Sequence, residues 1–259
     1  IKDSAFGNCY GLNGTLKLPY SIKSIGSYAF NNCSQLSGSL ELPESVLNIE
    51  SYAFCNCSGL NKSLTIPNDL INLSDGLFFN CFQLKGELIL PEKIKSIGNY
   101  AFYNCSGFTG NLIIPNSVTI IGESSFYNNY GFKGTLKLSN SIEFINDFAF
   151  KNCSGFSGDL ILPNSILLIG NSAFESCSGF NGSLVILSNE KIQILNQSFQ
   201  STKFSLVIYN NSIQPNCSSN SFPSNQKILL PIDYKDPEFC GIILIYPTKT
   251  YHPSPSQTI

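Results

Sequence analysis

The chain has 259 residues, of which 42% are apolar and 12% charged, so it can bury a large core. Its net charge is −2, with 15 lysines, 17 acidic residues and no arginine, which argues against nucleic acid as a partner. His252 is the single histidine, so a Ser-His-Asp or Cys-His catalytic group and a histidine-ligated zinc are not expected. No run of 18 apolar residues predicts a membrane-spanning helix.

The sequence repeats every 24 residues. A phenylalanine column, a cysteine column and a proline column keep the same phase, with Asn129 and Ser139 each replacing a member once. One unit reads Ala-Phe-x-Asn-Cys-Ser-Gly-Phe/Leu-x-Gly-x-Leu-x-Leu-Pro-x-Ser-Ile-x-x-Ile-Gly-x-x. The phenylalanine column comprises Phe6, Phe30, Phe54, Phe78, Phe102, Phe126, Phe150 and Phe174.

Each unit predicts a short strand followed by a tight turn. In Leu40-Glu41-Leu42 the two leucines alternate with a charged residue, which is typical of a strand with one buried face. Pro43 ends this strand, and Gly38 precedes it at a position where a turn favours positive φ. The apolar spacing from residue 46 to residue 57 favours a tight, 3₁₀-like side over a long helix.

One 24-residue unit cannot bury its apolar groups alone, so we expect the units to stack, each strand pairing in parallel with the next. Ten strand cores are expected, eight regular ones from 16–18 to 184–186 and two more at 206–208 and 228–230. The resulting sheet should span on the order of 40–45 Å.

Three segments carry a resemblance to a known family: Leu90-Pro91, Ile97-Gly98 and Ala101-Phe102-Tyr103-Asn104-Cys105. They resemble the BspA-like leucine-rich repeats, and the likeness covers roughly residues 1–235. It implies a leucine-rich repeat solenoid, an α/β-type right-handed superhelix with a short parallel sheet on one face and little true helix. Members are mostly surface proteins of bacteria and parasitic protozoa. The resemblance therefore implies a cell-surface or secreted protein that binds a host or matrix protein or glycan, without enzymatic activity or a cofactor.

The ends of the chain differ from its middle. Residues 1–6 align with residues 25–30, so the sequence starts inside a repeat, and we expect it to be a fragment of a longer protein. The solenoid is predicted over residues 1–235, with a period that drifts from about residue 199. Residues 236–246 are predicted to add a capping strand, and the Pro/Ser-rich residues 247–259 a linker or stalk.

The cysteines and glycosylation sequons have both structural and functional interpretations. The repeat-column cysteines stand where a small buried residue is wanted, and no paired CxxC motifs indicate zinc. Cys217 and Cys240 lie outside this column and are candidates for a disulfide that closes the cap. Asn13, Asn61 and Asn181 are the best-placed glycosylation candidates, although a sequence rich in Asn and Ser forms sequons by chance.

The outward strand positions are the candidate partner-binding surface. This column is polar at first and mostly apolar from Ile89 onward, with a polar column beside it, as at an interaction surface. The alternative is that β-branched residues simply favour strands. The outward column is Lys17, Glu41, Thr65, Ile89, Ile113, Lys137, Ile161, Val185 and Val207.

A second column becomes apolar along the chain, on the other side of the repeat. Either its apolar members are tucked under neighbouring turns, or they form a self-association surface that makes a homo-oligomer. The column is Ser24, Asn48, Asn72, Ser96, Ile120, Phe144, Leu168 and Ile194.

These observations lead to three functional hypotheses. The first is an adhesin-like surface domain that binds a protein or glycan, the second a self-associating structural protein, and the third an intracellular scaffold with reduced thiols. An enzyme is the weakest hypothesis, because acidic residues such as Glu87 and Asp159 are three repeats apart, too far to share a proton or a metal.

Overall fold

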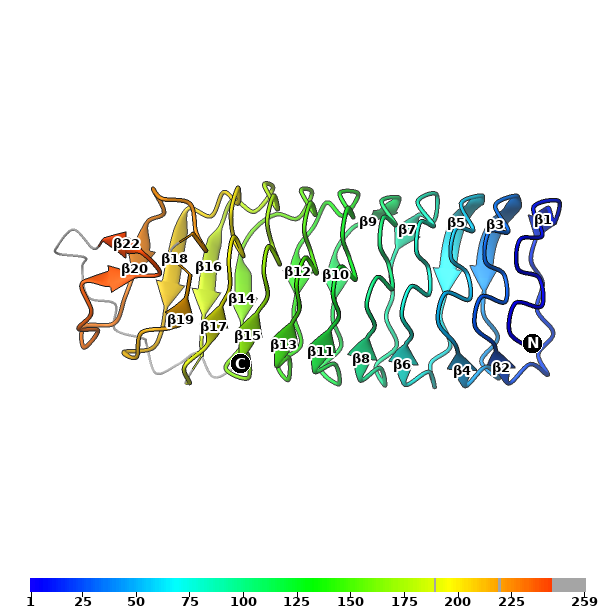
Figure 1. The fold of residues 1–259 in the computed structure, drawn as a ribbon, viewed down its shortest axis with the longest axis horizontal. Helices are drawn as coiled ribbons and strands as arrows, with labels where there is room; N and C mark the ends of the chain where they lie inside the picture. The colour runs from blue at the N-terminus through cyan, green and yellow to red at the C-terminus, as the bar shows by residue number, and fades with distance from the viewer. Residues whose placement is uncertain (189, 219, 244–259) are drawn as a thin grey trace.

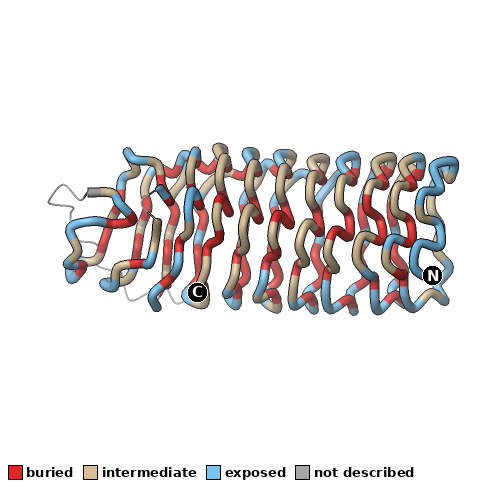
Figure 2. The backbone as a smooth tube through the Cα atoms, viewed as in Figure 1, coloured by how far each residue is buried: buried red, intermediate tan, exposed pale blue. Residues whose placement is uncertain are grey.

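The computed structural model describes residues 1–188, 190–218 and 220–243. In this part of the chain the repeats coil and stack into an elongated rod (Figure 1), and every assigned element is a short strand, with no helix. Buried residues lie along the inside of the coils (Figure 2). The prediction of a stacked 24-residue solenoid is therefore confirmed. Repeats are numbered here by the phenylalanine column, so that repeat 4 starts at Phe78 and repeat 5 at Phe102.

One face of the rod, here called the first face, carries the predicted parallel strands. Leu40 and Leu42 point inward and are buried, whereas Glu41 between them is exposed, as the alternation predicts. Parallel pairing joins these strands into four separate sheets, in the orders β1-β3-β5, β7-β9, β10-β12 and β14-β16-β18-β20. The strands are β1 (Gly14–Thr15), β3 (Leu36–Glu41), β5 (Leu60–Thr65), β7 (Gly86–Glu87), β9 (Phe108–Thr109), β10 (Leu112–Ile113), β12 (Leu136–Lys137), β14 (Leu160–Leu162), β16 (Ser183–Ile186), β18 (Leu206–Tyr209) and β20 (Ile228–Leu229).

The opposite side, here called the second face, forms a further parallel sheet where only tight 3₁₀-like structure was expected. Its two-residue strands place one side chain outward and one in the core, as Asn72 and Leu73 do, which is enough to continue a ladder from coil to coil. The prediction of a sheet on one face only is thus wrong. The strands are β2 (Ser24–Ile25), β4 (Asn48–Ile49), β6 (Asn72–Leu73), β8 (Ser96–Ile97), β11 (Ile120–Ile121), β13 (Phe144–Ile145), β15 (Leu168–Ile169), β17 (Gln193–Ile194) and β19 (Asn216–Cys217).

The turns between the two faces also hydrogen-bond along the rod. In repeat 2 the N–H groups of Tyr28, Phe30 and Asn32 donate to carbonyls of the next repeat at 2.8–3.0 Å. The residues between them donate to carbonyls three positions earlier in their own turn. The buried turn backbone is therefore satisfied without a helix.

An asparagine column explains how these turns close. Its members adopt φ near 60°, the left-handed conformation that asparagine tolerates better than most residues. Their side-chain amides form a ladder in which Nδ2 of Asn56 donates to Oδ1 of Asn32 at 2.8 Å. Asn32, Asn80 and Asn104 make the same bond to the repeat before them.

The phenylalanine column forms a continuous stack through the core. Neighbouring rings have centroids 5.0–5.9 Å apart, from Phe6 through to Phe199 and Phe222. A second stack begins at Phe108 and ends at Phe204. Burial of each such ring contributes about 2–3 kcal/mol, and only neighbouring repeats provide the apolar surroundings.

The cysteine column is a row of hydrogen-bond donors as well as a packing element. The Sγ of Cys57 donates to the carbonyl of Phe30 at 3.1 Å, and each buried cysteine of the column makes the same bond. Asn129 replaces one cysteine and donates from Nδ2 to the Phe102 carbonyl at 2.7 Å. Its Oδ1 is buried without a hydrogen-bond partner.

The period changes in the last repeats. Ile194 pairs with Ile169 and Val207 with Leu184, so a one-residue insertion on one side is followed by a one-residue deletion on the other. Val207 is consequently buried, and Ile208 takes the outward position that was predicted for Val207.

An antiparallel hairpin of β21 (Glu238–Phe239) and β22 (Ile242–Ile243) follows the last parallel strand. It occupies the beginning of the segment predicted as a capping strand, residues 236–246. The rest of that segment, the predicted linker 247–259 and His252 lie outside the described residues.

We expect Phe102→Ala to lower the free energy of unfolding by about 3–5 kcal/mol, because Phe102 is fully buried between two stacked rings. Urea denaturation followed by circular dichroism measures this change. The matched control Phe6→Ala should cost less, because Phe6 is 40% exposed. Equal losses for both variants would contradict a core shared between repeats.

We expect Asn129→Cys to raise the free energy of unfolding by about 1 kcal/mol, because it removes the unpaired Oδ1 and keeps a donor for the Phe102 carbonyl. Asn129→Ala, which leaves that carbonyl unpaired, should instead destabilise by about 1–3 kcal/mol. The same denaturation assay compares the two variants. A destabilised Asn129→Cys variant would show that the column does not need a thiol donor.

Candidate interaction surface

The outward column of the first face contains the most exposed aliphatic residues of the strands. Ile89 is 73% exposed, Ile113 55% and Ile161 47%. Lys17, Glu41, Thr65 and Lys137 are also exposed, whereas Val185 is partly covered. The structure thus places the predicted partner-binding residues on one face, in the order in which the repeats stack.

The first face is interrupted around repeat 4. Leu88, Ile89 and Leu90 belong to no strand, and none of their backbone groups makes a hydrogen bond within the described residues. A hollow of about 190 Å³ lies at this interruption, between repeats 4 and 5. It is lined by Glu87, Leu88, Ile89, Leu90, Glu92, Asn111, Ile113 and Pro115.

Polar residues beside this column serve the stacking of the repeats. The Oδ1 of Asn111 accepts the backbone N–H of Thr135 at 2.8 Å, and the Oδ1 of Asp159 accepts that of Ser183 at 2.6 Å. These side chains replace strand hydrogen bonds at the rim of the sheet. The polar column is therefore partly structural.

The second face also exposes apolar side chains. Ile120, Phe144 and Leu168 are adjacent across paired strands, and Ile120 is 38% exposed while the other two are partly covered. The last predicted member of this column, Ile194, is buried, because Gln193 pairs with Leu168. The apolar members are therefore not fully tucked under neighbouring turns.

The candidate glycosylation residues lie where the chain enters the first face. Asn13 and Asn181 are exposed and Asn61 is partly covered. The side-chain Oδ1 of Asn61 accepts the N–H of Gly38, and that of Asn181 accepts the N–H of Gly158. In both residues Nδ2, the atom that carries a glycan, makes no hydrogen bond within the described part of the chain.

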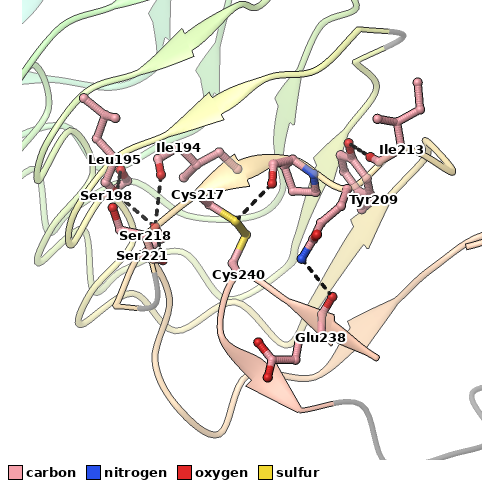
Figure 3. Close-up of a disulfide and its surroundings, with 12 residues drawn as sticks. Ile194, Leu195, Ser198, Tyr209, Ile213, Cys217, Ser218, Ser221, Glu238 and Cys240 are labelled. Atoms are coloured by element: carbon pink, nitrogen blue, oxygen red, sulfur yellow. Dashed lines mark hydrogen bonds between the residues drawn. A yellow bond between two sulfur atoms is a disulfide. The ribbon is translucent and has the colours of Figure 1, made fainter. Parts of the chain in front are cut away.

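Cys217 and Cys240 form a disulfide (Figure 3), with their Cα atoms 5.2 Å apart. Cys217 lies in β19, the last strand of the second face, and Cys240 lies between the two strands of the terminal hairpin. The bond therefore ties the hairpin to the end of the solenoid. Nearby, the Ser221 hydroxyl lies within hydrogen-bonding distance of the carbonyl of Leu195, and the Tyr209 hydroxyl donates to that of Ile213.

The other eight cysteines are free thiols, and all except Cys9 are buried. Burial raises the pKa of Cys55 to about 11, and that of Cys57, Cys81 and Cys177 well above the ordinary value. Because the thiolate is the reactive species, these buried thiols should be poor nucleophiles and poor metal ligands.

No cluster of three or more His, Cys, Asp or Glu side chains that could hold a metal ion occurs in the described residues. Within the same ranges no helix is long and apolar enough to cross a membrane.

The stacked coils with a leucine-lined strand in each unit define a leucine-rich repeat solenoid. The family described as "BspA type Leucine rich repeat region" matches residues 1–133 and 108–229, in six copies, and the chain belongs to this family.

Solved structures share the fold. A leucine-rich repeat protein from Bacteroides ovatus has a TM-score of 0.61 and 22% identity, over 88% of this chain and 64% of that one. A leucine-rich cell surface protein from Faecalibacterium prausnitzii has a TM-score of 0.54 and 22% identity, over 89% and 69%. The pneumococcal vaccine antigen PcpA has a TM-score of 0.54 and 19% identity, over 86% and 64%. This chain thus spans less than two thirds of the Bacteroides ovatus protein, and a search of the curated proteins finds no significant match.

We expect iodoacetamide at pH 8 to modify the native chain at Cys9 alone, because the other free thiols are buried. Mass spectrometry should find eight modified cysteines after unfolding without reductant and ten after unfolding with it. Labelling of Cys55 should increase as the pH rises toward 11, where its thiolate forms. Rapid native labelling of the column thiols at pH 8 would contradict this arrangement.

Proposed function

We propose that this chain is a non-enzymatic, adhesin-like repeat domain that binds a host or matrix macromolecule through its first face, at a cell surface or after secretion. The observation that carries the proposal is the exposure of Ile89, Ile113 and Ile161 in one column of an otherwise polar face. Aliphatic side chains held outward on a rigid sheet gain free energy when a partner covers them.

The shape of the surface favours a macromolecular partner over a small substrate. The hollow at repeats 4 and 5 has a volume of about 190 Å³, below the roughly 300–1,000 Å³ that is typical of small-molecule sites. The side chains around it include carboxylates and an amide but no histidine, cysteine or serine that could act as a nucleophile or its base. A long, shallow face of this kind suits an extended contact.

The fold neighbours support the location. One of them is described as a cell surface protein and another as a vaccine antigen. The Cys217–Cys240 disulfide is also more typical of an oxidising compartment than of the reduced interior of a cell, which disfavours an intracellular scaffold.

Self-association through the second face is the second candidate function. It is favoured by Ile120, Phe144 and Leu168, which are consecutive across paired strands and form one apolar row. A dimer through this row would leave the first face free, so the two functions are compatible.

We expect the triple variant Ile89→Ser, Ile113→Ser and Ile161→Ser to reduce attachment about tenfold or more, because several buried aliphatic contacts are lost. The assay measures attachment of beads coated with the chain to host cells and to extracellular matrix.

The matched control replaces Leu47, Ile71 and Leu167 by serine, since these residues are 36–56% exposed and lie outside the outward column. Circular dichroism checks that both variants fold, and sedimentation velocity reports self-association separately. Undiminished attachment by the folded triple variant would disprove binding through the first face.

A further inference from the structure

Two glutamates break the side-chain ladders that flank the first face. Glu44, two repeats before Glu92 at the same position, accepts the backbone N–H of Asn68 in the next repeat at 2.9 Å. Asn111, one repeat after Glu87, accepts the N–H of Thr135 in the same way. Glu87 and Glu92 accept no side-chain or backbone hydrogen bond and form no ion pair within the described residues, so their carboxylates are not used for stacking.

The backbone ladder is interrupted at the same place. The N–H groups of Leu112 and Ile114 donate onward to Thr135 and Lys137 in repeat 6. No hydrogen bond in the described structure joins residues 88–90 of repeat 4 to residues 112–114 of repeat 5. Unpaired backbone groups at a partly covered position are costly unless water or a ligand meets them.

Both free carboxylates line the one hollow at this interruption. Glu87 lies against repeat 5, since a Cβ on Gly110 would stand 3.2 Å from its carboxylate oxygen. Ile89 and Ile113 supply the apolar part of the lining, and no lysine is among the lining residues. The nearby Lys93 is paired with Asp69 of the repeat before it. The hollow therefore combines uncompensated negative charge with aliphatic surface.

We propose that this hollow receives a lysine or arginine side chain of a partner polypeptide, flanked there by apolar residues. The proposal rests on the proposed function and specifies the partner of the same face. The cationic head lies between Glu87 and Glu92 and donates to carbonyls of residues 88–90, while its methylene stem packs on Ile89 and Ile113. A glycan is disfavoured, because no aromatic ring on which a sugar could stack lines the hollow.

The test uses the full 259-residue chain and two synthetic peptides. One peptide is acetyl-Ser-Leu-Arg-Leu-Ser-amide, and the other carries citrulline in place of arginine, which keeps the shape and removes the charge. Titration is followed by NMR shifts of the backbone amides of residues 86–92 and 109–114. We expect the arginine peptide to bind at least fivefold more tightly than the citrulline peptide, and more weakly as salt is added.

The double variant Glu87→Gln and Glu92→Gln should weaken binding of the arginine peptide about three- to tenfold, because it removes two charge-assisted contacts. The control Glu41→Gln and Glu143→Gln changes the net charge equally at exposed residues outside the hollow, and it should bind as the unmodified chain does.

Equal affinity for both peptides, equal weakening by both double variants, or no shift with millimolar arginine peptide would each overturn the proposal. Saturable shifts of the same amides with calcium chloride that abolish peptide binding would also overturn it, in favour of a cation site. In the bead assay, attachment that is lost with the three isoleucines but kept by Glu87→Gln/Glu92→Gln would reject this inference alone. Attachment kept by both variants would reject the proposed function as well.

Discussion

The structure depends on the register with which each repeat hydrogen-bonds to the next. Strands on both faces pair with the same positions one repeat later, and the turns between them donate alternate N–H groups along the rod. A single inserted residue would turn core side chains outward on one face unless it were removed again. The compensated change of period between Ile169 and Val207 shows that the chain keeps this requirement where its sequence drifts.

The same requirement explains why the columns contain these residue types. Asparagine is used where the turn needs positive φ and a lateral amide, and phenylalanine where two neighbouring rings must cover each other. The cysteine position needs a small donor for a carbonyl, which is why Asn129 can replace it without a change of period. Interior positions are thus committed to stacking, and recognition is left to the outer faces.

The sequence predicts a large part of this architecture. The alternation in Leu40-Glu41-Leu42 is local, and a strict 24-residue period makes one strand predict the others, so the first face and its exposed column follow directly. The second face could not be predicted, because a pair such as Asn72-Leu73 is too short to show alternation and becomes a strand only beside its neighbours.

The candidate site was predicted only in part. The exposure of Ile89 and Ile113 follows from the repeat, but Val207 and Ile194 were misplaced by insertions that strand pairing alone reveals. The interruption beside Leu88–Leu90 has no sequence signal, since repeat 4 carries the same leucines and proline as its neighbours. It depends on the spacing between coils, which no single repeat encodes.

The alignment of the ladders with the rod has a mechanical consequence. Backbone and amide hydrogen bonds between coils run along the long axis, so a pulling force on the two ends opens them one after another instead of shearing them together. Each coil that peels away would release 24 residues, about 80 Å of extended chain. Under tension the rod should therefore lengthen in steps at low force, and the coils still stacked would keep their structure while the terminal ones unravel.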